Sequence, residues 1–178
     1  MGELAEKLAG VAQPAPAPGR GIASEAKQAQ RSEAKQPKFR VDDTGDRIHI
    51  EPEGMQVPQY GKGLTWGMTA YRGPLRNQGD QPRIYVRDAR LPEEMQGAGT
   101  GVAMYEHLAR MGQAERLRFQ SDGSVTNDAV NIWSALKRRG HDVQMASNHT
   151  YRPGPPEAPH LGRYETPDGG PMFWIDPQ

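Results

Sequence analysis

Gln96-Gly97-Ala98-Gly99-Thr100-Gly101 is a glycine-rich run between a predicted strand over residues 83–91 and a predicted helix over residues 102–111. Glycine has no Cβ, so it lets backbone N–H groups approach a ligand closely. The helix that follows adds its own free N–H groups and the positive end of its dipole. The sequence therefore predicts a site for a phosphate or diphosphate group at this turn.

Strand signals lie on both sides of the glycine run. Residues 47–51 alternate between polar and apolar side chains, and residues 64–72 form a second candidate that ends at Gly73-Pro74. After the run, residues 116–120 read as a short strand, and residues 142–145 begin another. These segments predict one sheet with strands before and after the first helix.

A second helix is predicted after Thr126, because threonine is a good N-cap residue and Gly140 is a natural stop. Its apolar side chains share one face: Ala129, Ile132, Trp133 and Leu136. The first helix is expected to stop at Gly112.

The end of the chain predicts a β-hairpin. Residues 164–166 and 172–175 are its two arms, and Pro167-Asp168-Gly169-Gly170-Pro171 is the turn. Together with the preceding elements, this order predicts a mixed α/β layer structure.

The first 40 residues read as a flexible, low-complexity leader, and residues 41–178 as one folded domain. Prolines at 14, 16 and 18 alternate with alanine, and Ser24-Glu25-Ala26-Lys27-Gln28 recurs at residues 32–36. These segments have almost nothing apolar to bury, so we expect a disordered tail. A sharper interpretation is that the leader docks onto a partner.

Composition narrows the functional classes. The 178 residues carry 22 basic and 22 acidic side chains, so no overall field favours nucleic acid or an anionic membrane. No apolar run reaches the roughly 20 residues that span a bilayer. The chain has no cysteine, which excludes disulfides and thiol chemistry and fits a cytoplasmic location. The five histidines show no metal-ligand spacing, so no metal is expected.

Three phosphate-binding turns compete for the glycine run. A Walker loop needs Gly-Lys followed by Ser or Thr, and no lysine lies near Gly101. A dinucleotide fingerprint starting at Gly97 needs Gly or Ala at the position of Val102. The third candidate is Gln or Arg, two residues, Gly, one residue, then Gly or Ala, and the run matches every required position. In this respect it resembles the acyl-CoA diphosphate loop of the GNAT superfamily of N-acetyltransferases.

The resemblance extends over about residues 83–145. Around the second helix, the family often has Asn, two residues, Ala, three residues, Tyr, and then Gly followed by an aromatic residue. In this chain, Thr126, Ala129, Trp133 and Gly140-His141 stand in comparable positions. The resemblance implies a GNAT-like mixed central sheet flanked by helices. It further implies that the strand before the loop splays from its neighbour and that acetyl-CoA binds at the gap. The implied cofactor-binding residues are Leu91, Gln96, Gly97, Ala98, Gly99, Thr100 and Gly101, with Gln96 closing the turn or contacting a phosphate oxygen.

The resemblance also implies direct acetyl transfer to an amine of a protein or small molecule. Candidate catalytic residues are Asp88 as a base, His141 as a second candidate base, and Tyr85 if it faces the cleft. Each has a simpler interpretation: Asp88 as an ion-pair partner of Arg87 or Arg90, His141 as a capping residue, Tyr85 as packing. The chain also departs from the family, because Trp133 stands where a proton-donating tyrosine is common.

Two other functions remain open at this point. The family's strand also usually supplies a glutamate as base, whereas residues 83–91 contain only Asp88 as a carboxylate. The missing tyrosine and glutamate would suit a GNAT-like module, such as an accessory protein of a phage or pathogen, that binds partners and transfers nothing. Tyr71-Arg72-Gly73 resembles the strand-borne arginine of ADP-ribosyltransferases, although their Ser-Thr-Ser strand and Glu-x-Glu turn are absent.

Overall fold

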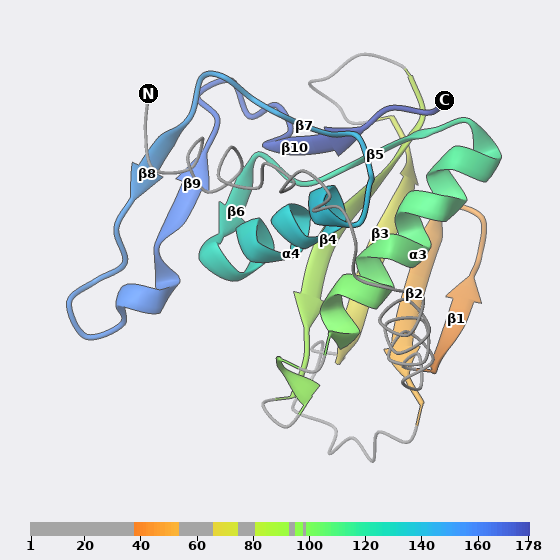
Figure 1. Cartoon of the computed structure of the whole chain (residues 1–178), viewed down its shortest axis with the longest axis horizontal. Helices are drawn as coiled ribbons and strands as arrows, with labels where there is room; N and C mark the ends of the chain where they lie inside the picture. The colour runs from red at the N-terminus through yellow and green to blue at the C-terminus, as the bar shows by residue number, and fades with distance from the viewer. Residues whose placement is uncertain (1–37, 54–65, 75–80, 93–94, 98) are drawn as a thin grey trace, which may run out of the picture.

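The computed structural model describes residues 38–53, 66–74, 81–92, 95–97 and 99–178 (Figure 1). The predicted leader therefore lies outside the described residues except at its end, where the first strand begins at Phe39. The same holds for residues 64–65 of the second predicted strand and for Ala98 of the glycine run.

Seven strands form the main sheet, which is mixed (Figure 1). The first four follow one another as antiparallel neighbours, β4 pairs with β5 in parallel, and β10 lies antiparallel between β5 and β7. The order across the sheet is β1 (Phe39–Asp43), β2 (Arg47–Pro52), β3 (Gly67–Gly73), β4 (Arg83–Arg90), β5 (Arg118–Gln120), β10 (Phe173–Ile175) and β7 (Val143–Met145). The prediction of a mixed α/β structure is confirmed.

Two helices, α3 (Thr100–Glu115) and α4 (Asn127–Arg138), cover the same face of this sheet. The ring of Phe119 in β5 contacts Tyr105 from α3 and Trp133 from α4, with centroid distances of 6.0 and 5.1 Å. Trp133 also stacks on Phe173 of β10. The core therefore lies between the helices and this face, and α3 is the crossover that a parallel β4–β5 pair needs.

The prediction that Gly112 ends the first helix is wrong. Helix α3 continues to Glu115, and Gly112 is buried inside it. A Cβ on Gly112 would lie 2.9 Å from the carbonyl oxygen of Leu117 and 3.3 Å from the Phe119 Cβ. Glycine is needed here because the helix packs closely on β5, not because the helix stops.

The helix α4 follows its prediction. The Thr126 side chain accepts a hydrogen bond from the N–H of Ala129 at 3.3 Å, as an N-cap residue should. Gly140 has a φ of 94°, which suits glycine just after a helix end. Trp133 and Leu136 are fully buried, so the predicted apolar face is the core face.

A second, three-stranded sheet was not predicted. It has the order β6 (Ser124–Thr126), β9 (Arg163–Glu165), β8 (Thr150–Arg152), and a 3-10 turn, η2 (Pro159–Leu161), precedes β9. The three strands are short, and their side chains give little alternation from which to predict them.

The predicted C-terminal hairpin is wrong, because its two arms belong to different sheets. Its first arm is β9 of the small sheet, and its second arm is β10 of the main sheet. The hydroxyl of Ser121 accepts hydrogen bonds from the N–H groups of Met172 and Phe173 at 3.1 and 3.0 Å. These contacts draw β10 to the end of β5, away from β9. In the part of the chain that the structure describes, no helix is long and apolar enough to cross a membrane.

Candidate functional site

The strand β4 changes its pairing halfway along. Residues 83–85 pair with β5, and Tyr85 opposite Gln120 is the last pair. Next to it, the register with β3 shifts: Ala70 faces Val86 but Thr69 faces Asp88, so Arg87 is one residue too many. A bulge of this kind bends a strand and increases its twist. Beyond the bulge, β4 runs on to Arg90 beside β3 alone, and the edge toward β5 has no strand partner among the described residues.

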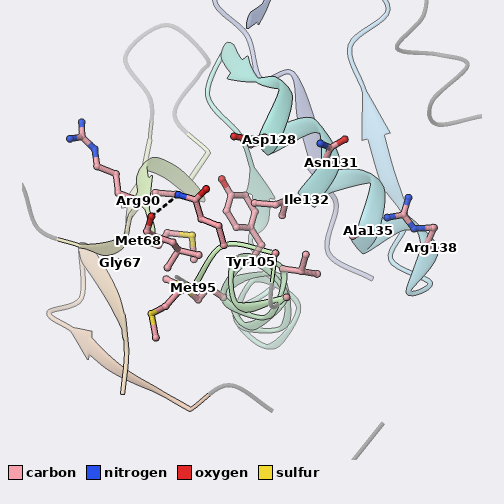
Figure 2. Close-up of a pocket in the computed structure, with 18 residues that line it drawn as sticks. Gly67, Met68, Arg90, Met95, Tyr105, Asp128, Asn131, Ile132, Ala135 and Arg138 are labelled. Atoms are coloured by element: carbon pink, nitrogen blue, oxygen red, sulfur yellow. Dashed lines mark hydrogen bonds between the residues drawn. The ribbon is translucent and has the colours of Figure 1, made fainter. Parts of the chain in front are cut away.

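A cleft of about 510 Å³ opens at this unpaired end (Figure 2). We call it the glycine cleft. It is lined by the end of β4, by the glycine turn and the first turns of α3, and by one face of α4. The contributing residues are Gly67 and Met68; Ala89, Arg90 and Leu91; Met95, Gln96, Gly97, Gly99 and Gly101; Val102, Met104 and Tyr105; and Asp128, Asn131, Ile132, Ala135 and Arg138.

The glycine turn has a backbone shape that depends on glycine. Gly97 and Gly99 have φ values of 77° and 81°, which favour glycine. The Gln96 side chain donates a hydrogen bond to the carbonyl oxygen of Leu91 at 2.9 Å, so it closes the turn, one of its two predicted roles (Figure 2). A Cβ on Gly97 or Gly99 would meet no protein atom within 4 Å, because both residues border the open cleft.

The N-terminus of α3 opens into the glycine cleft, and no side chain caps it. Gly99 is its N-cap residue, and no acidic residue lies in its first turn. Within the helix the first N–H to find a partner is that of Ala103, which bonds to the Gly99 carbonyl at 3.0 Å. The N–H groups of residues 100–102 precede it and have no intrahelical acceptor. Among the described residues they have no hydrogen-bond partner, so they can bind an anion, and the helix dipole favours one there.

Gly101 is needed for a different reason. It has an ordinary helical backbone, but a Cβ on it would lie 3.3 Å from Cδ1 of Ile132 and 3.5 Å from Cδ1 of Leu91. Glycine at this position therefore lets α4 and the end of β4 approach the start of α3. The three glycines of the run thus have two functions, backbone shape at Gly97 and Gly99 and close packing at Gly101.

One of the three cations at the end of α4 lines the cleft. Arg138 does so, whereas Arg139 forms a 2.7 Å ion pair with Glu106 on α3. Lys137 is exposed and is not part of the lining. Figure 2 shows Arg138 at the far end of α4 from Asp128, the carboxylate that lines the cleft.

Tyr105 is a cleft residue that the sequence reasoning missed. Figure 2 shows its ring rising from α3 toward α4, between Met68 and Ile132. Burial raises the pKa of its phenol, and the charge of Asp88 raises it further. The group therefore stays protonated at neutral pH and can donate a hydrogen bond. Its helical spacing from Val102 and Leu108 indicates by itself only an apolar core face, to which Tyr105 also belongs.

Two of the predicted catalytic residues lie on β4 but outside the cleft lining. Asp88 pairs with Arg90 at 3.2 Å, and both side chains are nearly half exposed. Tyr85 stacks on Tyr71 of β3 at a centroid distance of 5.7 Å. Asp88 is thus found in an ion pair and Tyr85 in packing, the simpler interpretation of each residue.

The third predicted residue, His141, also lies outside the lining. Its Nε2 atom is 3.4 Å from Oε1 of Glu106, which also pairs with Arg139 and Arg110. The indole of Trp133 is fully buried in the aromatic core, and its N–H has no hydrogen-bond partner in the described structure. Trp133 is therefore a packing residue and does not reach the cleft.

Arg72, which suggested an ADP-ribosyltransferase, is held by carboxylates. It pairs with Asp43 of β1 at 2.9 Å and with Glu115 of α3 at 2.7 Å, and it also donates to the carbonyl oxygen of Gly45. These contacts explain Arg72 as a clamp between β1, β3 and α3.

No cluster of three or more His, Asp or Glu side chains within the described ranges is arranged to hold a metal ion. None of the protein-family models, curated proteins or solved structures compared with the chain matches it. A functional proposal therefore rests on the geometry of the glycine cleft.

Proposed function

We propose that the glycine cleft binds acetyl-CoA and that the chain is a GNAT-type N-acetyltransferase. One observation carries the proposal: an uncapped helix start, a glycine turn and an unpaired strand edge line the same cleft. The N–H groups at the start of α3 suit a diphosphate. The free edge of β4 near Ala89 suits an extended amide-bearing chain, because such a chain can pair with it as a strand would.

Bound acetyl-CoA would supply a thioester carbonyl, open to attack by a neutral amine, and a thiolate as leaving group. The chain would contribute mainly position and hydrogen bonds. Tyr105 lines the cleft and stays protonated, since burial raises its pKa, so it is the candidate to donate a hydrogen bond toward a sulfur atom there. Asp128 is the carboxylate among the described lining residues and is the candidate to accept the proton that the amine loses.

A pair of matched glycine variants tests the binding step. Gly99 and Gly140 both have positive φ, at 81° and 94°, and a Cβ on either meets no atom within 4 Å. Gly99→Ala and Gly140→Ala should each cost about 1 kcal/mol of stability through backbone strain. Only Gly99→Ala would place its methyl group in the cleft, so it should weaken acetyl-CoA binding about tenfold by calorimetry.

The contradicting outcomes are simple to recognise. Equal acetyl-CoA affinities for the two variants would overturn the assignment of the loop. Pantetheine lacks the diphosphate, so it should bind much more weakly than CoA. If pantetheine and CoA bound equally well, the proposed role of the α3 N-terminus would be wrong.

A second candidate is a module that binds acetyl-CoA and transfers nothing. It is favoured by the positions of Asp88, Tyr85 and His141, none of which lines the cleft. Thiol release separates the two candidates, because the chain has no cysteine and so gives no background with a thiol reagent. Acetyl-CoA would be incubated with a panel of peptide and small-molecule amines. Binding without amine-dependent thiol release would support the module and contradict the transferase.

A further inference from the structure

The chain enters the folded domain at the end of the main sheet where the glycine cleft lies. In the sheet register, Phe39 at the start of β1 lies opposite Pro52 at the end of β2. Gly67 and Arg90, which both line the cleft, pair with each other at this same end. Figure 1 shows the start of β1 and the start of α3 both at this end of the molecule. The residues that precede Phe39 in the sequence therefore join the domain close to the cleft.

The point of entry is fixed on the helix side of the sheet. The Phe39 ring packs edge-on against His107 of α3 with a centroid distance of 5.3 Å. The carbonyl oxygen of Lys38 accepts a hydrogen bond from the N–H of Glu53 at 2.9 Å. His107 follows Tyr105 by two residues, about 200° around the helix, so α3 stands between Phe39 and the cleft. The route from Phe39 to the cleft therefore passes around the start of α3.

Helix geometry gives the approximate length of this route. His107 follows Thr100 by seven residues, which is about 10 Å along the helix axis at about 1.5 Å per residue. Crossing the helix, whose diameter with side chains is about 10–12 Å, brings the total to about 20 Å. A side chain that reaches the cleft from upstream of Phe39 needs at least this length of chain.

A repeat in the sequence places two lysines at different distances from Phe39. Lys27 and Lys35 occupy the same position in the two copies of Ser-Glu-Ala-Lys-Gln, twelve and four residues before Phe39. At about 3.3–3.6 Å per extended residue, twelve residues span up to about 40 Å and four residues up to about 14 Å. The tether of Lys27 thus exceeds the route around α3, whereas Lys35 reaches the cleft only with its backbone and side chain fully stretched. Because the local sequences are identical, tether length is what distinguishes the two lysines.

We propose that the glycine cleft acetylates Lys27 of its own chain. This inference rests on the function proposed above and adds the acceptor to it. A tether longer than the route presents the amine to the cleft at an effective concentration on the order of millimolar, without any further contact. The neutral Nζ atom of Lys27 attacks the acetyl carbon, which forms the carbon–nitrogen bond, breaks the carbon–sulfur bond and releases CoA as the thiolate. Asp128, the carboxylate among the described lining residues, accepts the proton that Nζ loses.

Mass spectrometry of the full chain after incubation with acetyl-CoA tests the acceptor. Lys27 should be acetylated about tenfold faster than Lys35 or more, because its tether passes around α3 without being stretched. The rate per chain should stay the same when the protein is diluted, since the reaction is intramolecular. Lys27→Arg should remove this acetylation, whereas Lys137→Arg, which changes an exposed lysine outside the cleft, should not. Equal rates at Lys27 and Lys35, or a rate per chain that falls on dilution, would overturn the inference.

A disulfide test measures the reach of Lys27 without any cofactor. The chain has no cysteine, so two introduced cysteines can pair only with each other or with another chain. Asn131 is exposed and lines the cleft, which makes Asn131→Cys a suitable partner. With oxidised glutathione, Lys27→Cys combined with Asn131→Cys should form the disulfide within one chain about tenfold faster than Lys35→Cys combined with Asn131→Cys. Equal rates for the two pairs, or disulfides between chains alone, would contradict the proposed route.

Two further results separate this inference from the function on which it rests. If added amines cause thiol release from acetyl-CoA but Lys27 stays unmodified, the transferase stands and the inference about Lys27 is wrong. If acetyl-CoA binds and neither Lys27 nor any added amine receives the acetyl group, the transferase and the inference are both wrong.

Discussion

The two ends of β4 differ in their strand partners and in the part of the chain that surrounds them. At the Arg90 end, β4 pairs with β3 alone among the described strands, and main-chain N–H groups and a helix dipole face the glycine cleft. At the Arg83 end, β4 pairs with both β3 and β5, and arginine side chains gather where β4 and β5 begin. The open end depends on glycines that are close together in sequence. The closed end depends on residues that meet only because β4 and β5 start side by side.

The bulge at Arg87 explains why one strand has two such different ends. Before it, β4 is paired on both edges, and Ile84 lies opposite Arg72 in β3 and Phe119 in β5. After it, β4 keeps only its β3 partner, and the freed edge borders the glycine cleft. One extra residue therefore separates a closed, packed half from an open half that can bind an extended ligand.

The strongest test of this separation is Gly101→Leu. The new side chain must displace Ile132 or Leu91 and fill the cleft, since even a Cβ would lie 3.3 Å from Ile132. We expect the affinity for acetyl-dephospho-CoA to fall by about a hundredfold or more, because several charge-assisted N–H contacts are lost together. This probe lacks the 3′-phosphate, so it reports on the diphosphate contacts.

The same variant should leave the other end of β4 unchanged. The Trp174 indole N–H donates to Asp176, which also pairs with Arg118, so its nuclear magnetic resonance signal should keep the wild-type position and show that the variant is folded. Conversely, Arg118→Gln breaks the ion pair with Asp176 and should preserve acetyl-dephospho-CoA binding. A shifted Trp174 signal in the first variant, or weaker cofactor binding in the second, would mean that the two ends of β4 are not independent.

The sequence predicted the strand-to-helix turn at the glycine run better than the roles of the residues around it. The turn joins β4 to α3, as predicted, because glycines that allow positive φ are a local property of the sequence. Gly112 shows the limit of this reasoning. Its contacts with Leu117 and Phe119 come from packing, which a helix-stop rule does not consider.

Side-chain roles were harder to predict because they depend on the bulge. Period-two alternation along β4 does not show which side chains face the cleft once an extra residue is inserted. Asp88 was a candidate base because it is the carboxylate of that strand, and its other interpretation, an ion pair, is what the structure contains. Tyr105 occupies an apolar position of α3, and only the packed structure shows that this position also borders the cleft.

A smaller effect is expected from charge at the start of α3. Val102 lines the cleft in the first turn, where α3 has no acidic residue. Val102→Glu and Val102→Gln have the same shape but differ in charge. The helix dipole should make the glutamate variant more stable by about 0.3–1 kcal/mol in urea unfolding.

Acetyl-CoA affinity should change in the opposite direction in this pair. The carboxylate competes with a diphosphate for the free N–H groups, so Val102→Glu should bind several-fold more weakly than Val102→Gln. If Val102→Glu were more stable than Val102→Gln but bound acetyl-CoA equally tightly, the diphosphate would not bind at the start of α3.

The smallest effect concerns the ion pairs beside the closed half of β4. Arg72 lowers the pKa of Asp43 from 3.8 to about 2, chiefly through their hydrogen bond. A carboxylate with a depressed folded-state pKa stabilises the protein above its unfolded pKa and loses that effect as the pH falls. Because the pair is partly exposed, its contribution should not exceed about 1 kcal/mol.

Asp43→Asn isolates this contribution, because asparagine mimics the protonated acid. Urea unfolding should show the wild-type chain to be more stable than the variant at pH 7. The difference should shrink as the pH falls from about 4 to about 2, where Asp43 becomes protonated in the folded chain. If the difference in the free energy of unfolding stayed constant over this range, Asp43 would act through packing. Its charge would then not stabilise the strands beside the closed half of β4. Acetyl-CoA affinity at pH 7 should be the same in both chains, because the pair lies outside the glycine cleft.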